Sequence, residues 1–179
     1  DYLLHVADVL SEVVPVRVTD NIIGHLYSKL MINSCISSLG VISGLYLGKM
    51  LSIKKIRKIF IEIIREGVTV ADKMNLKIEI FGGKIDFHEF VKGNSFLSDI
   101  RRHFMIRIIG FKYRRLKSSS LQSVERGRLT EIDYLNGYIV RNASAHNVPV
   151  PVNAAIVMLV REIEQKKRQI TPGNFNDPL

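Results

Sequence analysis

A stripe of large apolar residues at helical spacing is the feature that most constrains how this chain can fold. Within residues 53–75 the stripe consists of Ile53, Ile56, Ile59, Phe60, Ile63 and Ile64. The opposite side of the same segment carries the charged residues Lys54, Lys55, Arg57, Lys58, Glu62 and Arg65. This pattern repeats with the period of an α-helix. We therefore expect a long amphipathic helix here, with its apolar face in a protein core and its charged face in solvent.

Helical patterns cover most of the remaining chain. We expect further helices at 2–13, from a cap at Thr19 or Asp20 onward, over the apolar run 35–51, over 86–109 with a break near Gly93, from a cap at Thr130 until Pro149 and Pro151 end it, and, with Asn153 as a possible cap, at 152–167. Extended chain is expected at 14–18, because Pro15 blocks a helix and valines prefer strand. A turn-rich connection with a short extended piece is expected at 76–84, with a bend at Gly82-Gly83. No strong sheet signal or repeat occurs. The fold class is therefore expected to be mostly α: a single helical domain at 1–170, with a tail at 171–179 that is loose or docked as coil.

The composition fits a compact domain in a reducing compartment. The chain has 179 residues, of which 46% are hydrophobic, and this excludes a disordered protein. Its one cysteine, Cys35, rules out an internal disulfide and lies in an apolar run, so we expect a core residue rather than a nucleophile. The opening DYLLHVADVL has no basic n-region, and we expect no signal peptide and a cytoplasmic protein. The run 35–51 is short for a membrane span and is expected to be a buried helix, with small residues at Gly40, Gly44 and Gly48 for close approach of another helix.

The charge balance is strongly basic, with a net charge of +9 and a pI near 9.8. Basic clusters occur at 54–58, 101–102, 112–117 and 166–168. Such clusters can form a nucleic-acid surface, or they can be solvated helix faces whose field attracts anionic ligands. No nucleic-acid-binding motif accompanies them, so we expect the second alternative. His88 and His103 lack partners at metal-ligand spacing, and no metal site is expected.

Polar residues that could hold a small organic acid gather between positions 119 and 133. They are Ser119, Gln122, Arg126, Thr130, Glu131 and Asp133. The acids of this group could equally serve only to cap a helix start. Upstream, Lys29 and Asn33 are four residues apart and share one helix face. They could reach into one pocket, or they could be a solvated lysine and a polar core contact.

Four segments in a fixed order, one upstream and three in the C-terminal part of the chain, carry a family resemblance. The quoted segments are Leu26–Asn33 (LYSKLMIN), Ser118–Gln122 (SSSLQ), Arg128–Gly137 (RLTEIDYLNG) and Val148–Asn153 (VPVPVN). In this order they resemble the C-terminal half of the ketopantoate reductase (2-dehydropantoate 2-reductase) family, with Tyr27 where the family usually has tryptophan. The resemblance implies the helical C-terminal domain of that family, which is related to the corresponding domain of 6-phosphogluconate dehydrogenase.

The resemblance implies a reductase that uses NADPH to convert ketopantoate to pantoate in pantothenate and coenzyme A biosynthesis. In the family, the NADP-binding Rossmann domain precedes the helical domain, and the active site lies between them. The present chain contains no G-x-G-x-x-G motif that could open such a domain. We therefore expect the cofactor to be bound mainly by a Rossmann partner domain absent from this chain, and the chain alone to be inactive. A homodimer is a further possibility.

The resemblance also implies roles for particular residues. It makes Lys29 the general acid, Asn33 and Ser119 ligands of the substrate, and Glu131 a ligand of the substrate hydroxyl and a possible cofactor contact. Ser37 is a possible substrate ligand, where the family often has a second asparagine; similarly, Ser123 stands where it usually has aspartate. These two departures leave open a reductase of another 2-keto acid. A non-catalytic helical dimerisation module is the third alternative.

Overall fold

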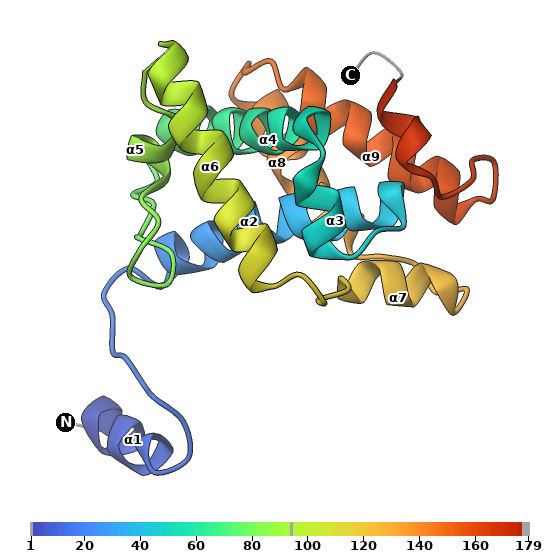
Figure 1. Cartoon of the computed structure of the whole chain (residues 1–179). Coiled ribbons are helices and arrows are strands. Elements are labelled where there is room, and N and C mark those ends of the chain that lie inside the picture. The colour runs from blue at the N-terminus through green and yellow to red at the C-terminus, as the bar shows by residue number, and fades with distance from the viewer. Residues whose placement is uncertain (1, 94, 177–179) are drawn as a thin grey trace.

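The computed structural model describes residues 2–93 and 95–176 and shows an all-helical arrangement (Figure 1). Its elements are α1 (Tyr2–Ser11), α2 (Ile22–Ser43), α3 (Leu47–Ser52), α4 (Lys54–Lys73), α5 (Phe87–Val91), α6 (Phe96–Lys112), α7 (Ser119–Glu125), the 3-10 helix η1 (Ile132–Tyr134), α8 (Asn136–Ala145), α9 (Pro151–Glu164) and the 3-10 helix η2 (Pro172–Asn176). Within the described residues, β-pairing is limited to one isolated bridge between Phe81 and Ile85. The mostly α fold class is thus confirmed.

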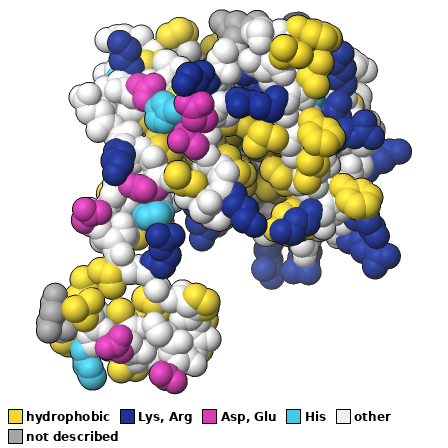
Figure 2. Space-filling model, turned by 60° about the vertical axis from the view of Figure 1, so that its left-hand side comes forward, with side chains coloured by type: hydrophobic (Ala, Val, Ile, Leu, Met, Phe, Trp, Pro, Cys, Tyr) yellow, Lys and Arg dark blue, Asp and Glu magenta, His cyan; other side chains and the backbone are white. Residues whose placement is uncertain are grey.

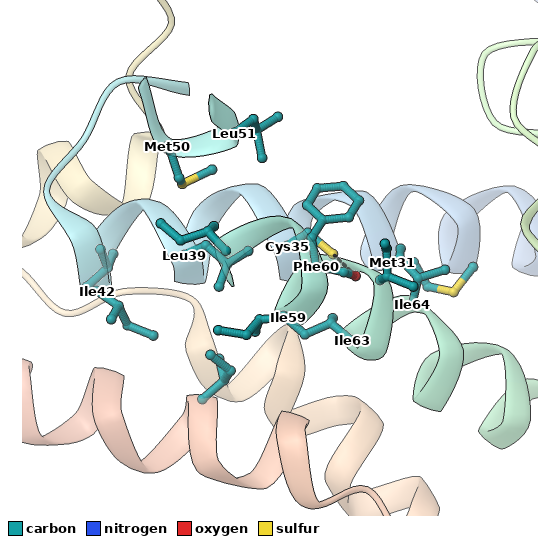
Figure 3. Close-up of a cluster of buried hydrophobic side chains, with 14 of the residues drawn as sticks. Met31, Cys35, Leu39, Ile42, Met50, Leu51, Ile59, Phe60, Ile63 and Ile64 are labelled. Carbon is teal, nitrogen blue, oxygen red and sulfur yellow. Dashed lines mark hydrogen bonds between the residues drawn. The ribbon is translucent and has the colours of Figure 1, made fainter. Parts of the chain in front are cut away.

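The core forms where α2, α3, α4 and α9 meet. Figure 3 shows Met31, Cys35, Leu39 and Ile42 of α2 facing side chains of α3 and α4. The predicted apolar stripe of α4 is buried, with Ile56, Ile63 and Ile64 fully inaccessible. The inner face expected for the last helix is also buried, at Ile156, Leu159, Val160 and Ile163 of α9. Burying each such side chain contributes about 1.5–3 kcal/mol, so this junction stabilises the domain.

The expectation of one helix over 35–51 was wrong. Helix α2 ends at Ser43, because Gly44 takes a left-handed conformation (φ 70°) and its N–H bonds the carbonyl of Gly40 at 2.9 Å. The chain then turns into the short α3. The glycine face does serve close approach: a side chain at Gly40 would collide with Ser118, and one at Gly48 with Arg114.

The N-cap of α2 is not the residue predicted from the sequence. Asn21, not Thr19 or Asp20, is the N-cap, and its Oδ1 accepts from the Gly24 N–H at 3.1 Å. Its Nδ2 also donates to the Lys77 carbonyl (3.0 Å) and to Glu79 Oε1 (2.7 Å). The first turn of α2 is therefore tied to the connection that precedes the Gly82-Gly83 bend.

The helix predicted to begin at Thr130 is divided. Thr130 Oγ1 accepts from the Ile132 N–H at 3.1 Å, and the helix that follows is only the short η1. At Leu135 (φ −102°, ψ −103°) the backbone breaks before α8 starts. The break allows Ile132 to enter the core while Asn136 turns towards Asn153. Asn153 does not cap α9: it lies inside the first turn, after the N-cap Val150 and after Pro151 at the first helical position.

Two arginines assigned to exposed basic clusters are buried. Arg57 of α4 donates from Nη1 to the Leu51 carbonyl at 2.8 Å, and it is 7% exposed. Arg102 of α6 is 1% exposed, and its Nη1 donates to the carbonyls of residues 91–93. Both guanidinium groups satisfy carbonyls at helix ends, which explains their burial. The predicted break near Gly93 is confirmed, since α5 and α6 are separate helices.

The two ends of the chain behave differently. The described part of the tail is docked as η2, where Phe175 is 2% exposed and Asn174 Nδ2 donates to the Ile42 carbonyl at 3.2 Å. Residues 177–179 lie outside the described residues. At the other end, α1 lies apart from the helical body (Figure 1) and has no buried residue. Residues 15–19 join it to α2 without regular secondary structure. Val14, expected in the extended segment, instead belongs to the turn that ends α1, since its N–H donates to the Leu10 carbonyl at 3.1 Å.

Candidate active site

Helix α2 carries three of the candidate site residues on one face. Lys29, Asn33 and Ser37 follow one another at intervals of four residues, so they lie one above the next along the helix. Lys29 is exposed, Asn33 is half-buried and Ser37 is 8% exposed. None of the three side chains forms a hydrogen bond or ion pair with any residue that the structure describes. The result is a polar row that leads from the surface into the domain.

The residues just before Lys29 fix its turn of the helix. The Tyr27 hydroxyl donates to the Gly67 carbonyl of α4 at 2.8 Å, and its ring meets Tyr138 of α8 edge-on at 6.4 Å. Burial, followed by the nearby Tyr138 and Asp72, raises the pKa of Tyr27, so the hydroxyl remains a donor. Ser28 Oγ bonds the carbonyls of Gly24 and Glu79. Lys29 therefore projects from an immobilised backbone.

Ser119 lies at the first turn of α7, which packs against α2. Ser118 caps this helix by accepting from the Leu121 N–H at 3.2 Å, and its hydroxyl lies against Gly40. Gly40 is three residues beyond Ser37, so the start of α7 lies beside the inner end of the polar row. Ser119 itself is exposed.

Glu131 occupies the turn that precedes η1. The turn is anchored on both sides, because the Thr130 N–H donates to Glu164 Oε1 at 2.6 Å and Ile132 is buried. The Glu131 side chain is exposed. Among the described residues, no hydrogen bond or ion pair joins Lys29, Asn33, Ser119 and Glu131 to one another. The fold thus brings Ser119 to α2 through packing of the neighbouring Ser118, whereas no such contact joins Glu131 to Lys29.

A largely buried polar network not foreseen from the sequence joins α4, α8 and α9. Glu66 of α4 accepts from the Val152 N–H at 2.9 Å, and from the N–H and the Nδ2 of Asn153 at 2.8 and 2.7 Å. Asn153 in turn accepts from Asn136 Nδ2 at 2.9 Å. The sequence does contain a signal for this network. Position 66 continues the apolar stripe of α4 after Ile63, and a carboxylate on that buried face needs hydrogen-bond partners. The network joins Asn136, near the end of the segment Arg128–Gly137, to Asn153, at the end of the segment Val148–Asn153.

His88, His103 and Cys35 have structural partners. His88 Nε2 lies 2.8 Å from Asp72 Oδ1, and His103 Nδ1 accepts from Arg57 Nε at 3.2 Å. No group of three His, Cys, Asp or Glu side chains that could hold a metal occurs in residues 2–93 and 95–176. Cys35 is fully buried, and burial raises the pKa of its thiol well above the usual range, which confirms its place in the core. In the same described ranges, no helix has the length and apolar character that a transmembrane span requires.

Comparison with known proteins assigns the chain to a family. The family model described as "Ketopantoate reductase PanE/ApbA C terminal" matches residues 21–164. A 2-dehydropantoate 2-reductase of Pyrococcus horikoshii is 28% identical over 83% of this chain and 42% of its own length. The Shigella flexneri enzyme of the same name is 26% identical over 94% of this chain and 49% of its own length. The chain thus spans about half the length of the curated relatives it matches.

Solved structures agree with this assignment. A PanE/ApbA family ketopantoate reductase from Ralstonia eutropha JMP134 superposes with a TM-score of 0.73 at 29% identity, over 93% of this chain and 49% of that one. D-mandelate dehydrogenase, solved with NADH and anilino(oxo)acetate, shares the fold with a TM-score of 0.73 at 21% identity, over 92% of this chain and 48% of its own. This chain belongs to the ketopantoate reductase family and corresponds to its C-terminal domain.

Proposed function

We propose that this chain is the substrate-binding and catalytic half of a cytoplasmic, NADPH-dependent 2-dehydropantoate 2-reductase, which converts ketopantoate to pantoate for pantothenate and coenzyme A biosynthesis. The observation that carries the proposal is the polar row of Lys29, Asn33 and Ser37 on α2, with the Ser119 end of α7 packed beside it. Membership of the family supports the reaction class.

The residues of this chain suit the protonation that a keto-acid reduction needs. Reduced nicotinamide, when bound, supplies a hydride to the keto carbon. The ammonium group of Lys29 polarises the ketone and then donates a proton to the new alkoxide oxygen. Lys29 has no ion-pair partner among the described residues, so no carboxylate in that part of the chain neutralises it.

The other side chains orient the substrate. The Asn33 amide and the Ser119 hydroxyl are donors for the substrate carboxylate and its neighbouring oxygen, and Glu131 accepts from the substrate hydroxyl. Ser37 lines the inner end of the row. Serine carries a shorter side chain than the asparagine that is common there in the family, so it leaves more room for the substrate at that point.

The nucleotide-binding half is a required partner in this proposal. The curated relatives are about twice as long as this chain. Helix α1 leaves Tyr2, Leu4, Val9 and Leu10 exposed and makes no buried contact with the helical body. Such an uncovered apolar face needs a partner. We assign that place to a Rossmann domain that binds NADPH.

The test is NADPH oxidation by the two-domain protein with ketopantoate. We expect turnover by the unaltered protein, a loss of kcat of about 100- to 10,000-fold in Lys29→Ala, which removes the general acid, and no loss in Lys55→Ala on the exposed face of α4. Equal activity of the two variants would remove Lys29 from the chemistry. No oxidation with any keto acid, by folded protein that binds NADPH, would favour a non-catalytic module.

A second candidate is a reductase of another 2-keto acid. Ser37 and Ser123 motivate it, because both replace larger polar residues in the family pattern. Turnover of a bulkier 2-keto acid in preference to ketopantoate, with the same dependence on Lys29, would select this candidate.

A further inference from the structure

Lys29 and Glu131 stand on separate elements of the fold. Lys29 lies on α2, whereas Glu131 lies in the turn before η1. No hydrogen bond or ion pair joins their side chains among the described residues. Both elements are instead tied to helix α4, at the neighbouring residues Glu66 and Gly67. This pair is termed the α4 hub.

Gly67 connects the hub to the turn of α2 that carries Lys29. Its carbonyl accepts from the Tyr27 hydroxyl at 2.8 Å, and Tyr27 is buried. Glycine in the interior of a helix costs about 1 kcal/mol relative to alanine, so we expect a packing reason for it. An added side-chain carbon at Gly67 would lie 3.1 Å from Met31 Sδ of α2 and 3.7 Å from Ile139 Cδ1 of α8. Position 67 is therefore where α2 and α8 both approach α4 closely.

Glu66 connects the hub to the helices that follow Glu131. Its carboxylate accepts from the Val152 N–H, the Asn153 N–H and the Asn153 amide at 2.9, 2.8 and 2.7 Å. Asn153 accepts in turn from Asn136, and both of these side chains are fully buried. Asn136 is the first residue of α8, two residues after η1 ends. The hub thus holds the start of α9 and, through it, the start of α8.

The far end of α9 holds the Glu131 turn directly. Glu164 Oε1 accepts from the Thr130 N–H at 2.6 Å, one residue before Glu131. Arg161 donates to Asp133 Oδ1 at 2.6 Å, two residues after Glu131. The Glu131 turn is therefore bound to α9, which the hub anchors to α4.

The Glu66 carboxylate is used for this anchoring alone. Figure 2 shows acidic side chains lying among basic ones on the surface of one face. Glu66, in contrast, is half-buried and forms no ion pair within residues 2–93 and 95–176. All of its hydrogen bonds there go to the first turn of α9. Because each of these bonds is to a charged acceptor, they fix the start of α9 more firmly than neutral bonds would.

We propose that the α4 hub positions the general acid Lys29 and the substrate ligand Glu131 relative to each other. The inference rests on the proposed function, which gives those two residues their roles. Glu66 and Tyr27 are positioning residues: neither touches the substrate, and each acts through the element that it holds. A misplacement of about 1 Å can cost about 100-fold in rate, so the hub bonds should affect turnover as well as stability.

The first test is a double-mutant cycle in the two-domain protein, with NADPH oxidation by ketopantoate as the measurement. Glu66→Gln keeps the shape of the side chain but sets an amide donor against the donors of α9. We expect kcat/KM to fall about 10- to 100-fold. In a Glu131→Ala background the same change should have almost no further effect, because the residue that it positions is gone. Glu62→Gln, one turn earlier on α4 and half-exposed, is the matched control and should leave kcat/KM unchanged.

A second variant tests the α2 side of the hub and leaves Glu66 in place. Tyr27→Phe removes the donor to the Gly67 carbonyl and should lower kcat/KM about 3- to 10-fold. Tyr27→Trp should retain most of the activity, because an indole N–H is also a donor. Retained activity in Tyr27→Trp separates the hydrogen bond from the packing of the ring.

Spin labels measure the placement itself and need no turnover. Cys35 is fully buried, so labels attach to introduced cysteines in a two-domain protein whose nucleotide-binding half has no exposed cysteine. The labelled sites are Ile23→Cys, one turn before Tyr27, and Tyr134→Cys on η1, both at exposed positions. Pulsed electron paramagnetic resonance should show a label distance that shifts or broadens in Glu66→Gln and not in Glu62→Gln.

Several outcomes would overturn the proposal. They are additive losses in the cycle, full activity of Glu131→Ala or of Tyr27→Phe, and a label distance that Glu66→Gln leaves unchanged. Failure of the proposed function looks different, because the unaltered protein then reduces no keto acid. In that case the label distance alone decides whether the hub sets the placement of the two elements.

Discussion

At the scale of single residues, the contact between Arg57 and His103 couples stability to pH. Arg57 Nε donates to His103 Nδ1, so the ring accepts at that nitrogen and must be unprotonated there. Burial first, and then the positive charge of Arg57, lowers the pKa of His103. The unfolded chain, with an ordinary value of about 6.5, therefore binds a proton that the folded protein rejects. Stability from this contact is present above that value and is lost as pH falls below it.

His103→Gln tests this dependence, because the amide oxygen of the introduced glutamine can accept from Arg57 but does not titrate. We expect the free energy of unfolding of the unaltered chain to fall more than that of the variant between about pH 7.5 and about pH 5. Urea denaturation at the two pH values measures the difference. Equal losses would show that the histidine does not control the acid sensitivity.

At the scale of elements, Glu66 joins α4 to the start of α9. Its carboxylate accepts two backbone N–H groups of the first turn of α9 and the Asn153 amide. Glu66→Ala leaves these donors unpaired, and we expect a loss of about 2–4 kcal/mol in the free energy of unfolding. Glu62→Ala, one turn earlier on α4, removes a half-exposed pair with Arg65 and should cost less than about 0.5 kcal/mol. Similar losses in both variants, measured by chemical denaturation, would contradict the special role of Glu66.

The elements show where the sequence pattern is sufficient and where it is not. Periodicity predicts α4 and the inner face of α9, because both helices bury a continuous apolar stripe. It misplaces the end of α2, since an apolar run does not reveal that Gly44 turns left-handed and sends the chain into α3. It also places Arg57 in solvent, because its partners, the Leu51 carbonyl and the His103 ring, belong to the other helices α3 and α6. Helix existence is a local property, whereas these ends and partners depend on tertiary contacts.

The same division applies to the candidate site. The shared face of Lys29 and Asn33 follows from their spacing alone, and the structure has them on one side of α2. The approach of Ser119 to that helix could not be read from spacing, because it depends on a glycine at position 40 that admits Ser118. The place of Glu131 relative to Lys29 remains a prediction, which rests on the resemblance to the family.

At the scale of the whole molecule, α1 lies apart from the helical body (Figure 1). No residue of α1 is buried. The helical body begins at Asn21, which caps α2 and hydrogen-bonds the connection at 77–79. Residues 1–18 are therefore expected to contribute little to the stability of the body, although their exposed apolar side chains suit contact with a nucleotide-binding domain.

Removal of residues 1–18 separates these two roles. For the 179-residue chain we expect the Tm to change by less than about 2 °C, because less than about 0.5 kcal/mol is lost when no buried contact is removed. Phe175→Ala is the contrasting variant at the other end: its ring is 2% exposed, and its loss should cost about 3–5 kcal/mol and lower the Tm by roughly 10 °C. In the two-domain protein, the same deletion should abolish NADPH oxidation, because it removes the apolar side chains that we expect to contact the nucleotide-binding domain. A large drop in Tm for the isolated chain would show that α1 packs on the body, and the face assigned to the nucleotide-binding domain would be occupied already.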